Sequence, residues 1–290
     1  MKHLNQFITE YIVKKKLDKP IDSEDHYDYF PETKEELSKN IEECLNSKNY
    51  NLNCIDTSKI TDMSDLFYNS KFENINIDVS NWDVSNVKDM SNMFYGCKKF
   101  EGKGLENWNV SNVTNMSHMF YYCKNFDCDL SNWNVSNANN MASMFYGCSK
   151  FKGKGLENWN VSNVEYMNGM FANCENFKGK GLENWDVSNV KYMNGMFHQC
   201  FEFKGKGLEN WDVSNVENMQ CMFTYCNNFT GKGIENWDVS KVENMASMFY
   251  GCSKFKGKGL ENWDVSNVKY MNYMLEGCTL IKNKPSWYKE

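Results

Sequence analysis

Long apolar segments are absent from this 290-residue sequence. No run approaches the roughly 20 consecutive apolar residues of a membrane-spanning helix. The start also lacks the apolar stretch of a secretory signal, because Asn5, Gln6 and Thr9 interrupt it and the lysine run 14–16 follows it instead of preceding it. We therefore expect no membrane insertion, and a cytoplasmic or virion-associated protein rather than a secreted one. The compartment is otherwise unknown.

Histidine is also scarce: the chain has four, at unrelated positions of the pattern described below. No histidine therefore accompanies the many serines as a general base accompanies a nucleophile. The Gly-Lys-Gly loops lack the spacing and the Lys-Ser/Thr ending of a phosphate-binding loop. The formal net charge of −6 and the isoelectric point near 5.4 give no general attraction to nucleic acid. These absences predict a protein without catalytic activity, bound cofactor or nucleic-acid partner.

Tryptophan, in contrast, recurs with a fixed period. Eight tryptophans are spaced 26 residues apart, with a single step of 25 residues. A period of this length is typical of a solenoid, in which each repeat is one coil that buries its apolar face only against its neighbours. The eight are Trp82, Trp108, Trp133, Trp159, Trp185, Trp211, Trp237 and Trp263.

Each repeat has the same apolar pattern, which opens with L-x-x-W-x-V. This opening is a variant of the strand motif of leucine-rich repeats and predicts a short parallel strand. The next apolar residues follow at steps of three, four and three, the spacing of one helical face, which predicts a short helical or 3-10 turn. The expected fold is a leucine-rich-repeat-like solenoid of about nine coils. They begin at Leu52, Val79, Leu105, Leu130, Leu156, Leu182, Leu208, Ile234 and Leu260.

Eight of the twelve cysteines occupy one position of the repeat. A column of identical small apolar side chains indicates a core position. Without an export signal we expect structural free thiols, and disulfides or a metal site are the alternative. The column contains Cys97, Cys123, Cys148, Cys174, Cys200, Cys226, Cys252 and Cys278.

The repeats divide the chain into three parts. Residues 52–282 form the predicted solenoid, residues 1–51 an N-terminal helical segment and cap, and residues 283–290 a C-terminal cap. An amphipathic helix is expected over residues 4–12, before Pro20. A second is expected after Pro31, where Thr33 and Glu36 have the spacing of a capping box. Its apolar stripe is Leu37, Ile41, Cys44 and Leu45.

Polar residues also recur in columns. Ser and Asn, as at Ser111 and Asn112, follow most tryptophans at a fixed distance, and we expect them to bond the backbone of adjacent coils. Directly after four tryptophans stand stacked carboxylates, which repel one another unless a cation or a lysine relieves them. We interpret this column as solvated carboxylates with shifted pKa values, and a calcium site is the alternative. It contains Asp186, Asp212, Asp238 and Asp264.

Between the buried positions the coils vary, and many of the variable residues are aromatic. Exposed aromatic side chains on a rigid scaffold suit protein recognition. Neutral variation on a tolerant face is the alternative interpretation. The candidate partner-binding residues are Tyr122, Tyr166, Tyr192, His198, Phe201, Tyr225, Tyr270 and Tyr273.

The motif W-D-V-S-N-V-x-x-M-x-x-M-F-x-x-C-x-x-F resembles the BspA-like leucine-rich repeat family, also described as a mycoplasma-type domain of unknown function. The resemblance covers residues 52–282, with eight good repeats and one degenerate repeat. It implies a solenoid that binds proteins or host-cell components, without known catalysis. Many members are surface lipoproteins or adhesins, whereas this sequence shows neither a signal peptide nor a lipid-attachment cysteine.

Two functions follow as hypotheses. The first is a non-enzymatic, adhesin-like scaffold that binds a protein partner, with a glycan as the second partner class. The second is a structural component of a virion or another assembly, docked through the helix at residues 4–12. The start of the chain resembles the amphipathic leaders of proteins from large bacteriophages, which favours the second hypothesis.

Overall fold

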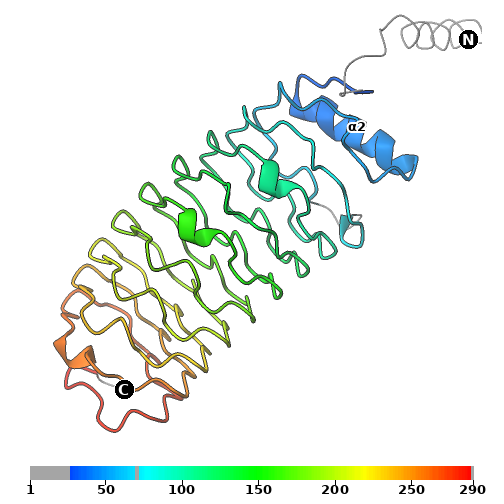
Figure 1. The fold of residues 1–290 in the computed structure, drawn as a ribbon. Coiled ribbons are helices and arrows are strands. Elements are labelled where there is room, and N and C mark those ends of the chain that lie inside the picture. The colour runs from blue at the N-terminus through cyan, green and yellow to red at the C-terminus, as the bar shows by residue number, and fades with distance from the viewer. Residues whose placement is uncertain (1–26, 69–71, 289–290) are drawn as a thin grey trace, which may run out of the picture.

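The computed structural model describes residues 27–68 and 72–288, and the first predicted helix lies outside this part of the chain. The described residues form an elongated stack of coils with an α-helix across its N-terminal end (Figure 1). Successive coils are joined by isolated parallel bridges between equivalent residues. One column of bridges runs through all the described coils, and its residues are Asp62, Asp89, Asn115, Asn140, Tyr166, Tyr192, Asn218, Asn244 and Tyr270.

Each coil is a succession of turns. In the coil that begins at Leu105, backbone N–H groups bond to the carbonyl three residues earlier at nearly every corner, as from Trp108 to Leu105 and from Cys123 to Phe120. The expected strand at L-x-x-W-x-V is wrong: the described residues contain bridges but no strand, and here a turn or 3-10 helix over L-x-x leads into an irregular W-x-V. The 3-10 helices are η2 (Leu105–Asn107), η3 (Leu156–Asn158) and η4 (Leu260–Asn262).

The expected helical turn between the valine and the cysteine is wrong as well. Two residues of this segment have left-handed backbone, as His118 and Tyr122 do with φ of 57° each. Left-handed residues interrupt a right-handed helix. Some equivalent positions in other coils hold Gly or Asn, such as Gly169, Gly147 and Asn173, which adopt this conformation at low cost.

The same segment carries the main hydrogen-bond ladder of the stack. Alternate residues donate their N–H to the next coil, while the residues between them accept from the previous coil through their carbonyls. The remaining N–H and carbonyl groups bond within the coil, so this segment leaves few backbone polar groups unpaired. The donors of one coil are Met116, His118, Phe120 and Tyr122, at 2.9, 2.8, 2.9 and 2.6 Å from their acceptors.

The tryptophan column lies inside the stack, and its polar atoms are paired. Trp185 is 3 % exposed, and its indole N–H donates to the Leu156 carbonyl of the previous coil at 3.0 Å. The other tryptophans make the equivalent bond, and Trp287 extends the series by donating to the Leu260 carbonyl. Buried indoles normally need such a partner. The bond therefore fixes each coil against the one before it.

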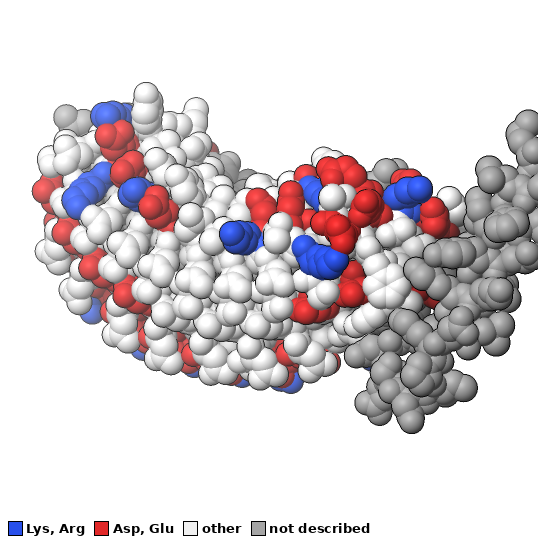
Figure 2. Space-filling view, turned by 90° about the horizontal axis from the view of Figure 1, so that it is seen from above, with Lys and Arg blue, Asp and Glu red and all other residues white. Residues whose placement is uncertain are grey.

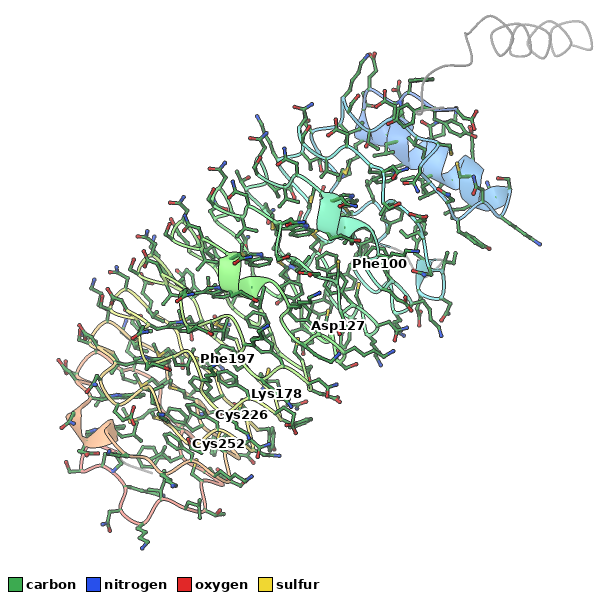
Figure 3. The ribbon with its side chains drawn as sticks, viewed as in Figure 1. Phe100, Asp127, Lys178, Phe197, Cys226 and Cys252 are labelled. Atoms are coloured by element: carbon green, nitrogen blue, oxygen red, sulfur yellow. The ribbon has the colours of Figure 1, made fainter. Side chains whose placement is uncertain are left out.

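The cysteine column is also buried, and its thiols are free. Each thiol donates to the carbonyl of the first of the two core phenylalanines of the preceding coil, as from Cys226 to Phe197 at 2.8 Å (Figure 3). Burial raises the pKa values of these thiols, to about 12 for Cys97.

The predicted Ser and Asn column is confirmed as a structural ladder: Asn163 Nδ2 donates to the Ser136 carbonyl at 2.7 Å, and other coils repeat this bond.

The N-terminal end of the stack is covered by helix α2 (Lys34–Asn46). Thr33 is its N-cap, and the Thr33 hydroxyl accepts from the Glu36 N–H at 3.2 Å. Leu37, Ile41 and Cys44 are buried and join the continuous apolar core of the coils. In the part of the chain that the structure describes, no helix is both long and apolar enough to cross a membrane.

Candidate binding face

The Met, Phe and Cys side chains point inward in the segment from the valine to the cysteine, which carries the backbone hydrogen bonds between coils. The residues between them form an outer face. All eight predicted binding residues lie on this segment or directly after it. They do not form one cluster. Tyr166 and Tyr192 stack on each other, with ring centres 5.4 Å apart, and no ring contact joins this pair to another predicted residue within the described chain.

A larger aromatic cluster lies on the four coils nearest α2. The rings of Tyr68, Tyr95, Tyr121 and Tyr146 stand in one column and contact each other in series, at centre distances of 4.6, 4.4 and 4.6 Å. Tyr122 packs edge-on against Tyr121 and Tyr146, at 4.9 and 5.4 Å. We call these five residues the tyrosine ladder.

The tyrosine ladder follows directly from the coil geometry. Each residue of its column directly follows a buried phenylalanine, so the side chain points outward. Equivalent side chains of successive coils are then separated by one coil spacing, close to the 4.5 Å at which aromatic rings begin to contact. The ladder is partly exposed: 53 % of Tyr68 and 38 % of Tyr122 remain accessible.

Three phenol groups of the ladder have raised pKa values. Burial, followed by the neighbouring phenols, raises the pKa of Tyr121 to about 12. Burial is also the largest cause of the raised pKa values of Tyr95 and Tyr146. These three tyrosines therefore offer neutral hydroxyl groups as donors and acceptors across the physiological pH range.

A cavity of about 480 Å³ opens beside the ladder. Its lining includes the rings of Tyr68, Tyr95 and Tyr122. Lys98 also lines the cavity and forms an ion pair with Glu73. The ammonium of Lys124 lines it too, and it has no ion-pair or hydrogen-bond partner among the described residues. The cavity thus combines aromatic edges, hydroxyl groups and one uncompensated positive charge.

The candidate list from the sequence contains one member of this cluster, Tyr122, and lacks Tyr68, Tyr95, Tyr121 and Tyr146. The available signal was their shared position in the repeat, because aligning the coils puts five tyrosines in one column: Tyr68, Tyr95, Tyr121, Tyr146 and Tyr250. Tyr225 repeats part of the arrangement further along the stack, where its ring lies edge-on to Tyr250 at 5.3 Å. Figure 2 shows one face of the stack, with rows of uncharged side chains between margins that carry most of the charge.

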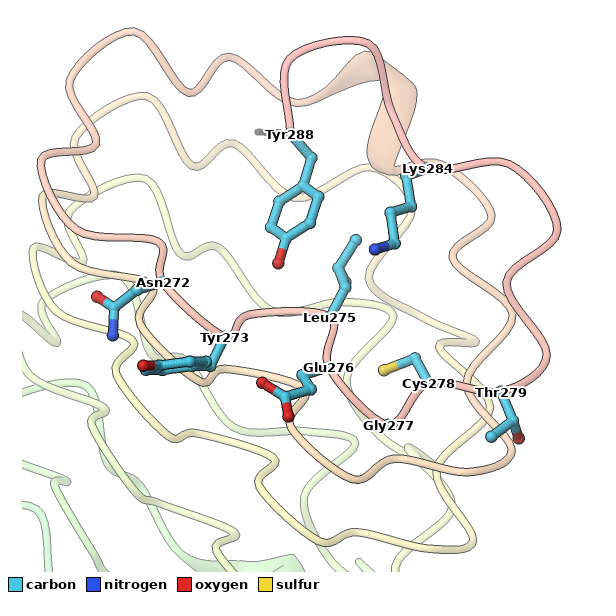
Figure 4. A pocket seen from close by; sticks show the side chains of 9 residues that line it. All are labelled: Asn272, Tyr273, Leu275, Glu276, Gly277, Cys278, Thr279, Lys284 and Tyr288. Carbon is cyan, nitrogen blue, oxygen red and sulfur yellow. The ribbon is translucent and has the colours of Figure 1, made fainter. Parts of the chain in front are cut away.

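The remaining predicted residues lie elsewhere. His198 is half-buried, its Nδ1 has no hydrogen-bond partner, and burial lowers its pKa. Phe201 is partly buried at the following corner. Tyr270 and Tyr273 belong to the last coil, where they are 59 % and 60 % exposed. Tyr273 lines a cavity of about 680 Å³ at this end, opposite Tyr288 (Figure 4).

The carboxylate column is used for local turns. The Asp186 carboxylate accepts from the Ser188 hydroxyl at 2.6 Å and from the Ser188 N–H at 3.1 Å. These bonds lower the pKa of Asp186, and the equivalent serines lower those of Asp212, Asp238 and Asp264. Within residues 27–68 and 72–288, no three His, Cys, Asp or Glu side chains converge as they would around a metal ion.

The stacked equivalent coils and their shared core define a repeat protein. The chain belongs to the family described as "Mycoplasma protein of unknown function, DUF285", whose model matches residues 35–154, 139–232 and 222–289. The predicted repeat is thereby confirmed.

No curated protein matches the chain. A solved structure titled "Crystal structure of TLR13-ssRNA13 complex" is 7 % identical with a TM-score of 0.21, a likeness too weak to support an argument. The match covers 86 % of this chain and 40 % of that chain.

Proposed function

We propose that the protein is a non-enzymatic scaffold that binds a protein partner through the tyrosine ladder and its cavity. We also assign the stack to the leucine-rich-repeat-like solenoids and to the BspA-like group, on the motif given above. The observation that carries the proposal is the contiguous tyrosine cluster over four coils, next to a cavity with an unpaired lysine. Tyrosine is enriched where interfaces gain most of their binding energy.

The arrangement of the rings favours a protein over a glycan. A sugar ring packs on the open face of an aromatic ring, but Tyr95, Tyr121 and Tyr146 are stacked face to face, with ring centres 4.4 and 4.6 Å apart. Ring edges and hydroxyl groups stay accessible, and these suit mixed polar and apolar protein surfaces. The free ammonium of Lys124 adds a preference for a partner with an Asp or Glu side chain at the cavity.

The surroundings of the histidines support the absence of catalysis. In the described chain, neither His118 nor His198 donates or accepts a hydrogen bond through its ring, so no serine is activated by a neighbouring base. Buried cysteines with raised pKa values are poor nucleophiles. The second hypothesis, docking through residues 4–12, falls outside the described residues and stays a prediction.

The natural variation between coils supplies substitutions that the fold already accepts. Changing Tyr121→Ala and Tyr122→Asn copies Ala172 and Asn173, which occupy the same two positions two coils later. A partner recovered by cross-linking to the wild-type protein should bind this variant roughly 30-fold or more weakly, because two interface tyrosines are lost. Isothermal calorimetry with the purified partner measures the change.

A matched control removes the other aromatic pair. Tyr166→Asn with Tyr192→Asn copies Asn140 and Asn218 in the bridge column, and it should change the affinity less than about twofold. Equal binding by the wild-type protein and the Tyr121→Ala, Tyr122→Asn variant would remove the tyrosine ladder as the binding site. An undiminished affinity in Lys124→Ser, which copies Ser149, would remove the acidic preference.

A further inference from the structure

Two cysteines outside the repeat column face each other where the cap helix meets the first coil. Cys44 lies in the last turn of α2, and Cys54 lies in the first coil. Their sulfur atoms are 3.9 Å apart. Cys44 is buried and Cys54 is partly exposed, so Cys54 is the more accessible residue of the pair. Both are free thiols in this structure.

The other cysteines have different surroundings. The eight thiols of the repeat column each donate to a backbone carbonyl inside the core, and Cys128 contacts the Glu106 carboxylate. Cys221 is partly exposed, but no second sulfur lies against it among the described residues. Cys44 and Cys54 are thus the one sulfur–sulfur contact in the described chain.

The geometry requires only a small movement for a bond. A disulfide has a sulfur–sulfur distance of about 2.05 Å, so the two atoms must approach by about 1.9 Å. The pair also joins three segments, because the carbonyl of Cys54 accepts from the N–H groups of Asp28 and Tyr29. A covalent bond here would tie α2 and residues 28–29 to the first coil at one point.

We propose that Cys44 and Cys54 form a reversible dithiol site that is oxidised by low-molecular-weight disulfides such as glutathione disulfide, and that its disulfide fastens the α2 cap to the coils. The Cys54 thiolate attacks glutathione disulfide, which gives a mixed disulfide and releases one glutathione. The Cys44 thiolate then attacks the Cys54 sulfur and releases the second glutathione. The two protein thiols lose two protons and two electrons, and the electrons reduce glutathione disulfide to two thiols.

The second step is the slow one. Burial raises the pKa of Cys44 to about 11, and the neighbouring Cys54 adds to this increase. Little Cys44 thiolate is therefore present at neutral pH. The rate of ring closure should therefore rise about tenfold for each pH unit between 7 and 9. This slow closure lets the mixed disulfide be trapped with acid and identified before the product forms.

Peptide mapping of the folded wild-type protein tests the proposal without any variant. Trypsin cleaves after Lys39, Lys48 and Lys59, so Cys44 and Cys54 fall on separate peptides, residues 40–48 and 49–59. After incubation with glutathione disulfide, these peptides should appear linked and two hydrogens lighter than their sum. Dithiothreitol should separate them. Glutathione on Cys221 serves as the positive control for oxidant activity.

Hydrogen exchange of α2 tests the structural consequence. The linked protein should exchange the amides of residues 40–48 on the order of 100-fold more slowly, because a short closed loop restricts opening of the cap. Cys54→Ser should abolish this redox dependence, and the matched Cys221→Ser should leave it intact. Glutathione on Cys221 without linked peptides would overturn the proposal, as would linked peptides with unchanged α2 exchange. If Cys54→Ser does not fold, the mapping alone still decides.

Discussion

Replacing Trp185 by alanine should destabilise the centre of the stack by about 3–5 kcal/mol, the usual cost of removing a buried aromatic side chain. The Trp185 ring is 3 % exposed and stacks between Trp159 and Trp211, with centres 6.3 and 6.4 Å away. Its indole N–H also donates to the Leu156 carbonyl. That carbonyl keeps a second donor, the Trp159 N–H at 3.2 Å, so the variant loses a bond without leaving the acceptor empty.

Trp185→Phe separates the two contributions. Phenylalanine retains most of the apolar contact and removes the N–H donor, so we expect a loss of about 1–2 kcal/mol. Tyr166→Ala is the exposed aromatic control, since 38 % of Tyr166 is accessible, and it should cost less than about 1 kcal/mol.

The assay should resolve individual coils, because in a repeat array the lost energy belongs to one coil and its two interfaces. Hydrogen exchange with mass spectrometry resolves the coil at residues 182–207 from the last coil. In Trp185→Ala the amides of residues 182–207 should exchange roughly 100- to 4,000-fold faster, the equivalent of the predicted energy. A change below tenfold there, or an effect confined to the ends, would refute the placement of the indole column in the core.

Three further predictions follow from single positions. Gly155→Ala should cost more than about 3 kcal/mol, because a Cβ at this residue (φ 95°) would lie 2.2 Å from the Ser131 nitrogen. Gly195→Ala, where a Cβ would meet nothing within 4 Å, should cost about 1–2 kcal/mol. Urea titration compares the two variants, and equal losses of stability would contradict the steric argument. Lys241→Asn should raise the free energy of unfolding by about 0.5–1.5 kcal/mol, because asparagine donates to the serine carbonyl of the previous coil everywhere else in this column. An unchanged urea midpoint would contradict this prediction. The hydrogen bond from Lys154 lowers the pKa of Asp129 to about 2, below its unfolded value of about 3.9. The ionised Asp129 therefore stabilises the fold above pH 4, and this stabilisation disappears as the pH falls to 2. The melting temperatures of the wild-type protein and Asp129→Asn should converge over this range, and a constant difference down to pH 2 would contradict the assignment.

The columns of the coil could be predicted from the sequence because burial selects the same residue type every 26 positions. Trp185, Cys200 and Asn163 each belong to a column whose neighbours are one coil away, so the period alone identifies their contacts. The same logic identified Thr33 and Glu36 as a cap, because helix capping depends on residues close in sequence.

The path of the backbone within a coil could not be predicted in the same way. The apolar steps between Val113 and Cys123 match a helical face, yet His118 and Tyr122 are left-handed and the segment is a ladder between coils. Single residues such as His118 give no local sign of this conformation. The glycines in the same two columns, Gly195 and Gly251, were the available signal, and they appear only when all coils are aligned.

The backbone ladder also determines how the stack responds to force. Its N–H···O bonds run from coil to coil along the long axis, so tension on the two ends loads the bonds of one interface together, and no bond spans two interfaces. Such a chain yields one coil at a time instead of all at once. Each coil that detaches releases 26 residues, or about 90 Å of extended chain, so stretching the molecule would lengthen it in equal steps.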